Sequence, residues 1–221
     1  MRVCLFDIDG TLLSSGGAGQ AAMEVALETA FGITAPTNGI SVAGRTDRAI
    51  TADLMRFHGI EETDENRDRF RQTYLARLPQ ELAAREGLVL PGVRTLLDEL
   101  NQQPHGTMGL LTGNFRQGAE TKLVHYELLH HFKCGGFGDH HHHRDDVARA
   151  ALDDFHEQFT NTEPTSLLVI GDTPADVQCG RAIGARVIAV ATGMYESDQL
   201  AATNPDYLFD DFSDVGRVLE A

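Results

Sequence analysis

The chain has 221 residues, of which 42% are hydrophobic and 23% charged, a balance typical of a soluble globular protein rather than a disordered chain. Its formal net charge of -15 argues against nucleic acid and anionic membrane surfaces as partners. No segment approaches the roughly 20 apolar residues of a membrane helix, and MRVCLFDIDG lacks the pattern of a secretory signal. We therefore expect a cytoplasmic protein, in which three widely spaced cysteines stay reduced.

The first predicted element is a short buried strand, RVCLF, that runs directly into two aspartates. The side chains of Asp7 and Asp9 are two positions apart, so on extended backbone they point the same way. Gly10 permits a turn and a close approach of the backbone to a ligand. The same DxDG pattern occurs in ordinary turns and in calcium loops, but the two leucines that follow cannot supply the further oxygen ligands of an EF-hand. The pattern favours a ligand site at the strand's carboxyl end.

A helical segment follows, with apolar residues at three-and-four spacing in AAMEVALETAF, TDRAITADLMRFHG and ENRDRFRQTYLARLPQELAARE. No strand-like alternation separates these patterns. We predict that residues 15–90 form an all-helical cap inserted into an α/β core made of residues 1–14 and 91–221. Pro91 and Gly92 mark the return to the core.

A second apolar run, GTMGLL, ends in Thr112, Gly113 and Asn114, just before the helical pattern FRQGAETKLVHY. The amino terminus of a helix offers free backbone N–H groups and a favourable dipole to an anion such as phosphate. These three residues also suit a plain turn or helix cap. Their position after a strand is what favours a binding role.

A third run, SLLVI, ends in GDTPAD, and a fourth, ARVIAVATG, follows the next helical pattern, which completes the alternation of an α/β domain. Asp172, at the strand's end, is typical of a ligand for a hard cation. Thr173 can cap a helix, Pro174 suits its first position, and Asp176 faces the positive end of the helix dipole. Asp176 is therefore a candidate either for capping or for the site.

Together, Asp7, Asp9, Asp172 and Asp176 would place four carboxylates at one sheet edge. Two like charges about 4 Å apart cost roughly 4 kcal/mol at an effective dielectric near 20, so the cluster needs compensation. Mg²⁺ fits because it prefers oxygen ligands and bridges carboxylates to phosphate. A phosphate bound there would also need a positive side chain.

The choice of that side chain is narrow, because the only lysines are Lys122 and Lys133. Arg144 stands where the helical pattern DDVARAALDDFHEQF begins, and a helix start can face the carboxyl edge of the sheet. Lys122 falls well inside its helix. We predict Arg144, with Lys133 as the alternative. The preceding His140–His143 run lies mid-chain, which argues against a tag and leaves a transition-metal site or a solvated loop that titrates near about pH 6.5.

These motifs, in this order, resemble those of the haloacid dehalogenase superfamily, in particular its phosphoglycolate phosphatase-like, magnesium-dependent branch with a helical cap. DIDGT (residues 7–11) is similar to the first motif, TGN (112–114) to the second, and GDTPAD (171–176) to the fourth. The third motif is usually a lysine, and Arg144 stands in its place. The resemblance covers essentially the whole chain and implies a Rossmann-like parallel sheet core.

The resemblance also implies roles for individual residues. Asp7 would attack phosphorus to form an aspartyl-phosphate, and Asp9 would act as general acid and then general base. Mg²⁺ would be held by Asp7, the backbone carbonyl of Asp9 and Asp172, with Asp176 binding directly or through water. The phosphoryl group would be bound by Gly10, Thr11, Thr112, Gly113, Asn114 and Arg144.

The function expected from these roles is hydrolysis of a small phosphorylated metabolite. A sugar phosphomutase shares the four motifs and is the first alternative. A non-catalytic phosphate-binding relative is the second, although the intact Asp7, Asp9 and Asp172 argue against it. In the cap, Arg45 could reach a carboxylate or second phosphate on the substrate, or lie in solvent. The identity of the substrate and the oligomeric state stay open.

Overall fold

A six-stranded parallel sheet forms the centre of the molecule in the computed structural model, which describes residues 1–34 and 39–221. Residues 35–38 of the predicted cap lie outside the described residues. The strand order is β5-β4-β1-β6-β7-β8, and all neighbours pair in parallel. The strands are β1 (Arg2–Phe6), β4 (Gly106–Leu111), β5 (Cys134–Gly136), β6 (Ser166–Gly171), β7 (Arg186–Val190) and β8 (Tyr207–Phe209). This confirms the predicted Rossmann-like α/β fold.

Strand β1 lies at the middle of the sheet and fixes the register around it. Phe6 pairs with Leu110 of β4 on one side and with Ile170 of β6 on the other. The strands are short and nearly all apolar because helices cover both faces of the sheet. The three strands end almost level, so the residues that follow them meet at one edge.

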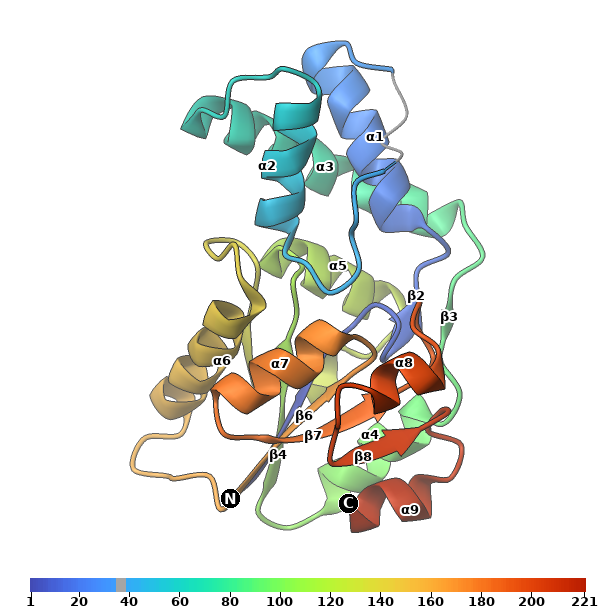
Figure 1. Cartoon of the computed structure of the whole chain (residues 1–221), viewed down its shortest axis with the longest axis vertical. Coiled ribbons are helices and arrows are strands. Elements are labelled where there is room, and N and C mark those ends of the chain that lie inside the picture. Colours follow the sequence, from blue (N-terminus) through green and yellow to red (C-terminus); the bar gives the residue numbers. More distant parts are fainter. Residues whose placement is uncertain (35–38) are drawn as a thin grey trace.

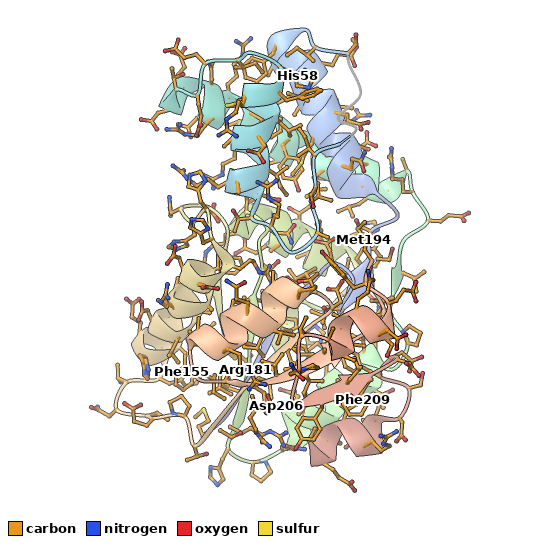
Figure 2. All side chains as sticks on the ribbon, in the orientation of Figure 1. His58, Phe155, Arg181, Met194, Asp206 and Phe209 are labelled. Carbon is orange, nitrogen blue, oxygen red and sulfur yellow. The ribbon has the colours of Figure 1, made fainter. Side chains whose placement is uncertain are left out.

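Two apolar clusters fill the space on either side of the sheet. Alternate residues of β1 point to opposite faces, so Phe6 joins one cluster and Leu5 the other. The first cluster involves α4 (Val93–Gln102), α5 (Arg116–His125), the short helix Leu129–His131 and α9 (Val215–Glu220), and it continues beyond the carboxyl edge of the sheet through residues such as Leu27, Leu54 and Phe70. The second involves α6 (Arg144–Gln158), α7 (Pro174–Ala182) and α8 (Ser197–Ala201). Phe155 of α6 is fully buried in it and lies at the end of the molecule away from α1–α3 (Figure 2).

The remaining helices gather beyond the carboxyl edge of the sheet, at the end opposite both termini (Figure 1). They are α1 (Ala18–Phe31), α2 (Asp47–Phe57) and α3 (Asp64–Ala83), and α1 packs mainly on α3. The side chains of Thr46 and Thr63 cap α2 and α3 by accepting hydrogen bonds from backbone N–H groups in the first turn of each helix. A two-stranded antiparallel pair, β2 (Leu13–Ser14) with β3 (Leu88–Val89), lies where the chain leaves for these helices and returns. Residues 15–90 are therefore not all-helical as predicted, because the returning chain pairs with the departing one at β3.

The three cysteines, Cys4, Cys134 and Cys179, are all buried and form no disulfide. Among the described residues, no helix combines the length and apolar character needed to cross a membrane.

Candidate active site

The carboxyl edge of the sheet brings together the residues that follow β1, β4 and β6. Asp7, Thr112 and Asp172 come directly after these strands, and all three are buried. Thr11, in the turn after β1, donates from Oγ1 to Oδ1 of Asp172 at 3.0 Å. Three segments that are distant in the sequence therefore form one site.

Asp7, Asp172 and Asp176 form a group of buried carboxylates with the chemistry of a metal site. Each offers an oxygen, and the three oxygens lie within 4.8 Å of one another. Burial raises the pKa of Asp7 to about 6, against the effect of Arg144. Burial, with repulsion from Asp7 and Asp176, raises the pKa of Asp172 to about 8. An all-oxygen set whose charges repel one another fits a hard divalent cation such as Mg²⁺.

The turn around this group depends on the absence of a side chain at Gly10. Its φ is +85°, in the left-handed region that favours glycine, and a Cβ there would stand 2.4 Å from Oδ2 of Asp172. Gly10 therefore lets the chain turn tightly against the carboxylate group, and its carbonyl accepts a hydrogen bond from Thr192 Oγ1 at 2.6 Å.

Arg144, at the start of α6, is the cation nearest these carboxylates. Its Nη1 and Nη2 lie 3.2 and 3.3 Å from Oδ1 of Asp7, and Nη2 also donates to Asp176 and, at 3.2 Å, to the carbonyl of Leu111. Lys133, the alternative, is exposed, and its Nζ donates to the His130 carbonyl at 3.5 Å. The structure therefore brings Arg144 into the site and leaves Lys133 outside it.

Asp176 caps α7 and also faces the carboxylate group, so its position fits both interpretations that the sequence left open. Its Oδ2 accepts hydrogen bonds from the backbone N–H of Thr173 at 3.0 Å and from the Thr173 hydroxyl at 2.7 Å, which caps α7. Its Oδ1 accepts from Arg144. One oxygen thus holds the helix start while the other faces the site.

A second cluster surrounds Asp9. Its Oδ2 accepts hydrogen bonds from Lys122 Nζ at 2.6 Å and from Asn114 Nδ2 at 2.9 Å. Lys122 also donates to Asn114 Oδ1 at 2.7 Å, and Asn114 donates to Thr112 Oγ1 at 2.8 Å. The expectation that Lys122 lies away from the site because it is inside its helix was wrong. It shares a helix face with Gly118 and Ala119, both buried, and a lysine on a buried face was the signal that could have found it.

The helices beyond the sheet add a residue that the sequence analysis missed, Asp47 at the start of α2. Its backbone N–H donates to the carbonyl of Gly113 at 2.7 Å, and its Oδ2 accepts from the backbone N–H of Phe115 at 2.8 Å. A Cβ at Gly113 would stand 2.0 Å from the carbonyl oxygen of Arg45, so α2 approaches this segment closely. Burial raises the pKa of Asp47 to about 6, against the effect of Lys122.

A cavity of about 440 Å³ lies between the sheet edge and these helices, a size suited to a small organic ligand. Asp7, Asp9, Asn114, Lys122, Arg144 and Asp172 line its floor, and Met23, Val42, Arg45, Asp47, Ile50, Tyr74 and Met194 line its upper part. Met194 lies between α1–α3 and the sheet (Figure 2).

Arg45 lines the cavity but is already paired, since its Nη2 lies 2.7 Å from Oδ2 of Asp53. Its side chain is 30% exposed. This partial exposure lies between the two expectations for Arg45, a side chain that contacts the substrate and one that lies in solvent.

The His140–His143 run lies beside the start of α2. Arg48 Nε donates to His142 Nε2 at 3.0 Å, and Thr46 Oγ1 donates to the His142 carbonyl at 3.4 Å. Burial lowers the pKa of His142, with Arg48 adding to the effect. Within the described residues, the histidines join no group able to hold a metal, and the predicted solvated loop fits their exposure better.

The chain is similar to proteins described as phosphatases. It is 33% identical over 57 residues to a phosphoglycolate phosphatase of Haemophilus influenzae, and this segment is 26% of the chain and 25% of that protein. Its fold matches a crystal structure described as a predicted phosphatase from Clostridium acetobutylicum, with a TM-score of 0.74, 20% identity and coverage of 100% and 99% of the two chains. It also matches one described as a predicted phosphoglycolate phosphatase from Haemophilus somnus, with a TM-score of 0.72, 20% identity and coverage of 99% and 97%.

The family assignment rests on a longer match. Residues 4–190 fit the model of the family described as haloacid dehalogenase-like hydrolase, which confirms the resemblance that the motifs predicted. Because this match spans most of the chain, from β1 to the end of β7, the protein belongs to the haloacid dehalogenase-like hydrolases.

Proposed function

We propose that this protein is a Mg²⁺-dependent phosphatase that hydrolyses a small phosphorylated metabolite through an aspartyl-phosphate on Asp7. The observation that carries the proposal is the buried group of Asp7, Asp172 and Asp176 beside Arg144, because Asp7, Asp172 and Arg144 line a cavity of about 440 Å³, a size that suits a small organic phosphate. The similarity to proteins described as phosphatases supports the reaction class.

The proposed metal ligands are Asp7, the backbone carbonyl of Asp9, Asp172 and Asp176, the last directly or through water. Mg²⁺, when bound, would neutralise the carboxylates and the phosphoryl oxygens that meet at this edge. The convergence of three buried carboxylates beside a single arginine supports this assignment, and burial raises the pKa of both Asp7 and Asp172.

Two carboxylates would carry out the chemistry in two steps. Asp7 attacks phosphorus and forms the phosphoenzyme while Asp9 protonates the leaving oxygen. Asp9 then takes a proton from the water that hydrolyses the phosphoenzyme. The phosphoryl oxygens would be bound by Arg144 and by the segments Gly10–Thr11 and Thr112–Asn114.

We further propose that residues 15–90 act as a cap over the site and that the protein works in the cytoplasm. The lining of the cavity by α1, α2 and α3 supports the cap, and three buried, unpaired cysteines suit a reducing compartment. Arg45 would recognise an anionic group on the substrate, a role supported by its position in the cavity wall.

The test is Mg²⁺-dependent release of phosphate from p-nitrophenyl phosphate and from a panel of phosphorylated metabolites. Asp7→Asn should abolish turnover, because an amide oxygen is a poor nucleophile, while the exposed control Lys133→Ala should keep it. Asp7→Asn with wild-type Mg²⁺-dependent release would make the mechanism wrong. A phosphomutase would release little phosphate and would need a bisphosphate activator, so the same assay separates the alternative.

A further inference from the structure

Lys122 is a buried lysine that the family's motifs do not account for. It lies in the second half of α5, its side chain is only 4% exposed, and its Nζ lies on the floor of the cavity. Removing an ammonium group from water is costly unless charged and hydrogen-bonding partners replace the water. The other lysine, Lys133, is exposed. The burial of Lys122 therefore needs an explanation.

The partners of Lys122 come from both sides of the cavity. Asp9 and Asn114 of the core accept its hydrogen bonds at 2.6 and 2.7 Å. Asp47, at the start of α2, interacts with it electrostatically, and the lysine counteracts the rise in the pKa of that buried carboxyl. Lys122 is thus placed where its charge offsets a carboxylate of the core and one of the predicted cap.

The hydrogen bonds around Asp9 leave its two oxygens in different environments. Oδ2 is fixed by two donors, Lys122 and Asn114. Oδ1 accepts no hydrogen bond from any of the described residues, and the side chain is 40% exposed toward the cavity. One oxygen is therefore anchored, which leaves the other available for proton transfer.

We propose that Lys122 is a positioning residue that holds the Asp9 carboxylate so that its free oxygen meets the leaving oxygen of the substrate. This inference rests on the proposed phosphatase mechanism, in which Asp9 is the acid and base. Lys122 does not touch the reacting phosphoryl group in this role. It acts through Asp9, with Asn114 as the second anchor.

The test uses substrates that differ in their need for a proton. An alkoxide leaving from ethyl phosphate needs protonation, whereas p-nitrophenolate leaves without it. Lys122→Met keeps the length of the side chain and removes its charge and donors, and Lys133→Met is the matched control. The kcat/KM value is the quantity to compare, because it covers the steps up to the phosphoenzyme.

Lys122→Met should lower kcat/KM for ethyl phosphate by about 10- to 100-fold, a part of the roughly 100- to 10,000-fold that a general acid supplies. For p-nitrophenyl phosphate the loss should stay below about 3-fold, and Lys133→Met should change neither value. Equal losses on the two substrates, or no loss on ethyl phosphate, would overturn the proposal.

A double-mutant cycle separates positioning from a general effect on folding. In an Asp9→Asn background, Lys122→Met should have little further effect on ethyl phosphate hydrolysis, because the residue through which it acts is gone. Lys122→Gln, which retains a neutral donor, should recover part of the selectivity between substrates. If both variants at this position are unfolded in thermal melts, the lysine serves folding alone and the proposal is wrong.

Failure of this inference can be told from failure of the proposed function. Active Asp7→Asn would refute the phosphatase mechanism whatever Lys122 does. Inactive Asp7→Asn together with an unselective Lys122→Met would refute only the role of the lysine.

Discussion

The site consists of two halves in which a buried cation offsets the negative charge of carboxylates. The Asp7 half contains Asp7, Asp172, Asp176 and Arg144, and the Asp9 half contains Asp9, Asn114, Lys122 and Asp47. In the Asp7 half, Arg144 faces Asp7 and Asp176, and every member comes from the core and is buried. In the Asp9 half, Lys122 faces Asp9 and Asn114, and the half-exposed Asp9 opens into the cavity. Each half pairs one buried cation with carboxylates at the same sheet edge.

The two halves differ in the number of carboxylates that gather around the cation and in where those carboxylates come from. The Asp7 half holds three buried carboxylates and one arginine, and burial raises the pKa of both Asp7 and Asp172. In the Asp9 half, an amide takes the place of a further carboxylate, and α2 rather than the core supplies the additional acid, Asp47. We infer that the first half, where three carboxylate oxygens converge, is built to receive a cation, whereas in the second half Lys122 and Asn114 already occupy the place beside Asp9.

The largest expected effect comes from breaking the Asp7 half at its arginine. Arg144→Ala leaves Asp7 and Asp176 buried without their cation, and removing one partner of a buried ion pair costs about 3–5 kcal/mol. Urea unfolding measures the change, with Lys133→Ala as the control. Mg²⁺ should restore part of the lost stability. A loss below about 1 kcal/mol would mean that the arginine does not balance these carboxylates.

The second prediction concerns the cation that the Asp7 half is proposed to receive. Mg²⁺ at 100 times its Kd should raise the free energy of unfolding by about 2.7 kcal/mol. Because protons must leave Asp7 and Asp172, whose pKa values are about 6 and about 8, the affinity should rise as the pH increases from 6 to 8. Thermal melts across a Mg²⁺ titration measure both effects.

Asp172→Asn is the control for that titration. It removes one ligand charge and should weaken the stabilisation by Mg²⁺ strongly, while Asp139→Asn, outside the group, should leave it intact. If stabilisation by Mg²⁺ does not depend on pH, or if Asp172→Asn does not change it, the ion does not bind at the Asp7, Asp172 and Asp176 group.

The third prediction tests the Asp9 half through its contact with α2. Asp47→Ala leaves the buried N–H of Phe115 without an acceptor, at a cost of about 1–3 kcal/mol. Asp47→Asn keeps an acceptor oxygen and should cost less. Equal losses from the two substitutions in urea unfolding would mean that this hydrogen bond does not matter.

The difference in stability between Asp47→Asn and the wild type should depend on pH, with a definite sign. The pKa of Asp47 is raised by folding from 3.8 to about 6, so the folded state binds the proton more tightly. Its contribution to stability is fully present below pH 3.8 and is lost as the pH rises through 6. The stability of Asp47→Asn relative to the wild type should therefore improve between pH 4 and 6. A constant difference across that range would contradict the raised pKa.

The two halves also differ in how far the sequence predicts them. Asp7, Thr112 and Asp172 follow short buried strands, and neighbouring parallel strands must end at one edge, so local pattern is enough to place them together. Arg144 could be predicted because it opens a helix. The sheet and the mainly helical character of residues 15–90 follow from the same periodic patterns.

Lys122 and Asp47 could not be placed in this way. Lys122 is seven residues after the N-cap Phe115, and which face of α5 meets the sheet edge is decided by packing rather than by the pattern of the helix itself. Asp47 reaches Phe115 across 68 residues of sequence, through a contact that exists only once α2 lies against the end of β4. Asp9 and Asn114 of the same half could be predicted from the strands that precede them, so the sequence left undetected only the two residues that tertiary contacts bring into the site.

The smallest expected effect on stability belongs to Arg45, on the cavity wall above both halves. Its ion pair with Asp53 is partly exposed, so Arg45→Ala should cost at most about 1 kcal/mol in urea unfolding. If Arg45 binds an anionic group of the substrate equally in the ground and transition states, KM should rise by about 10-fold with kcat unchanged. Arg56→Ala is the matched control, because Arg56 pairs with the same aspartate at 2.6 Å but lies outside the cavity wall. A similar KM change in both variants would mean that the effect comes from the loss of an ion pair with Asp53 on α2. Arg45 would then have no role in binding the substrate, and the two halves of the site below would bind it.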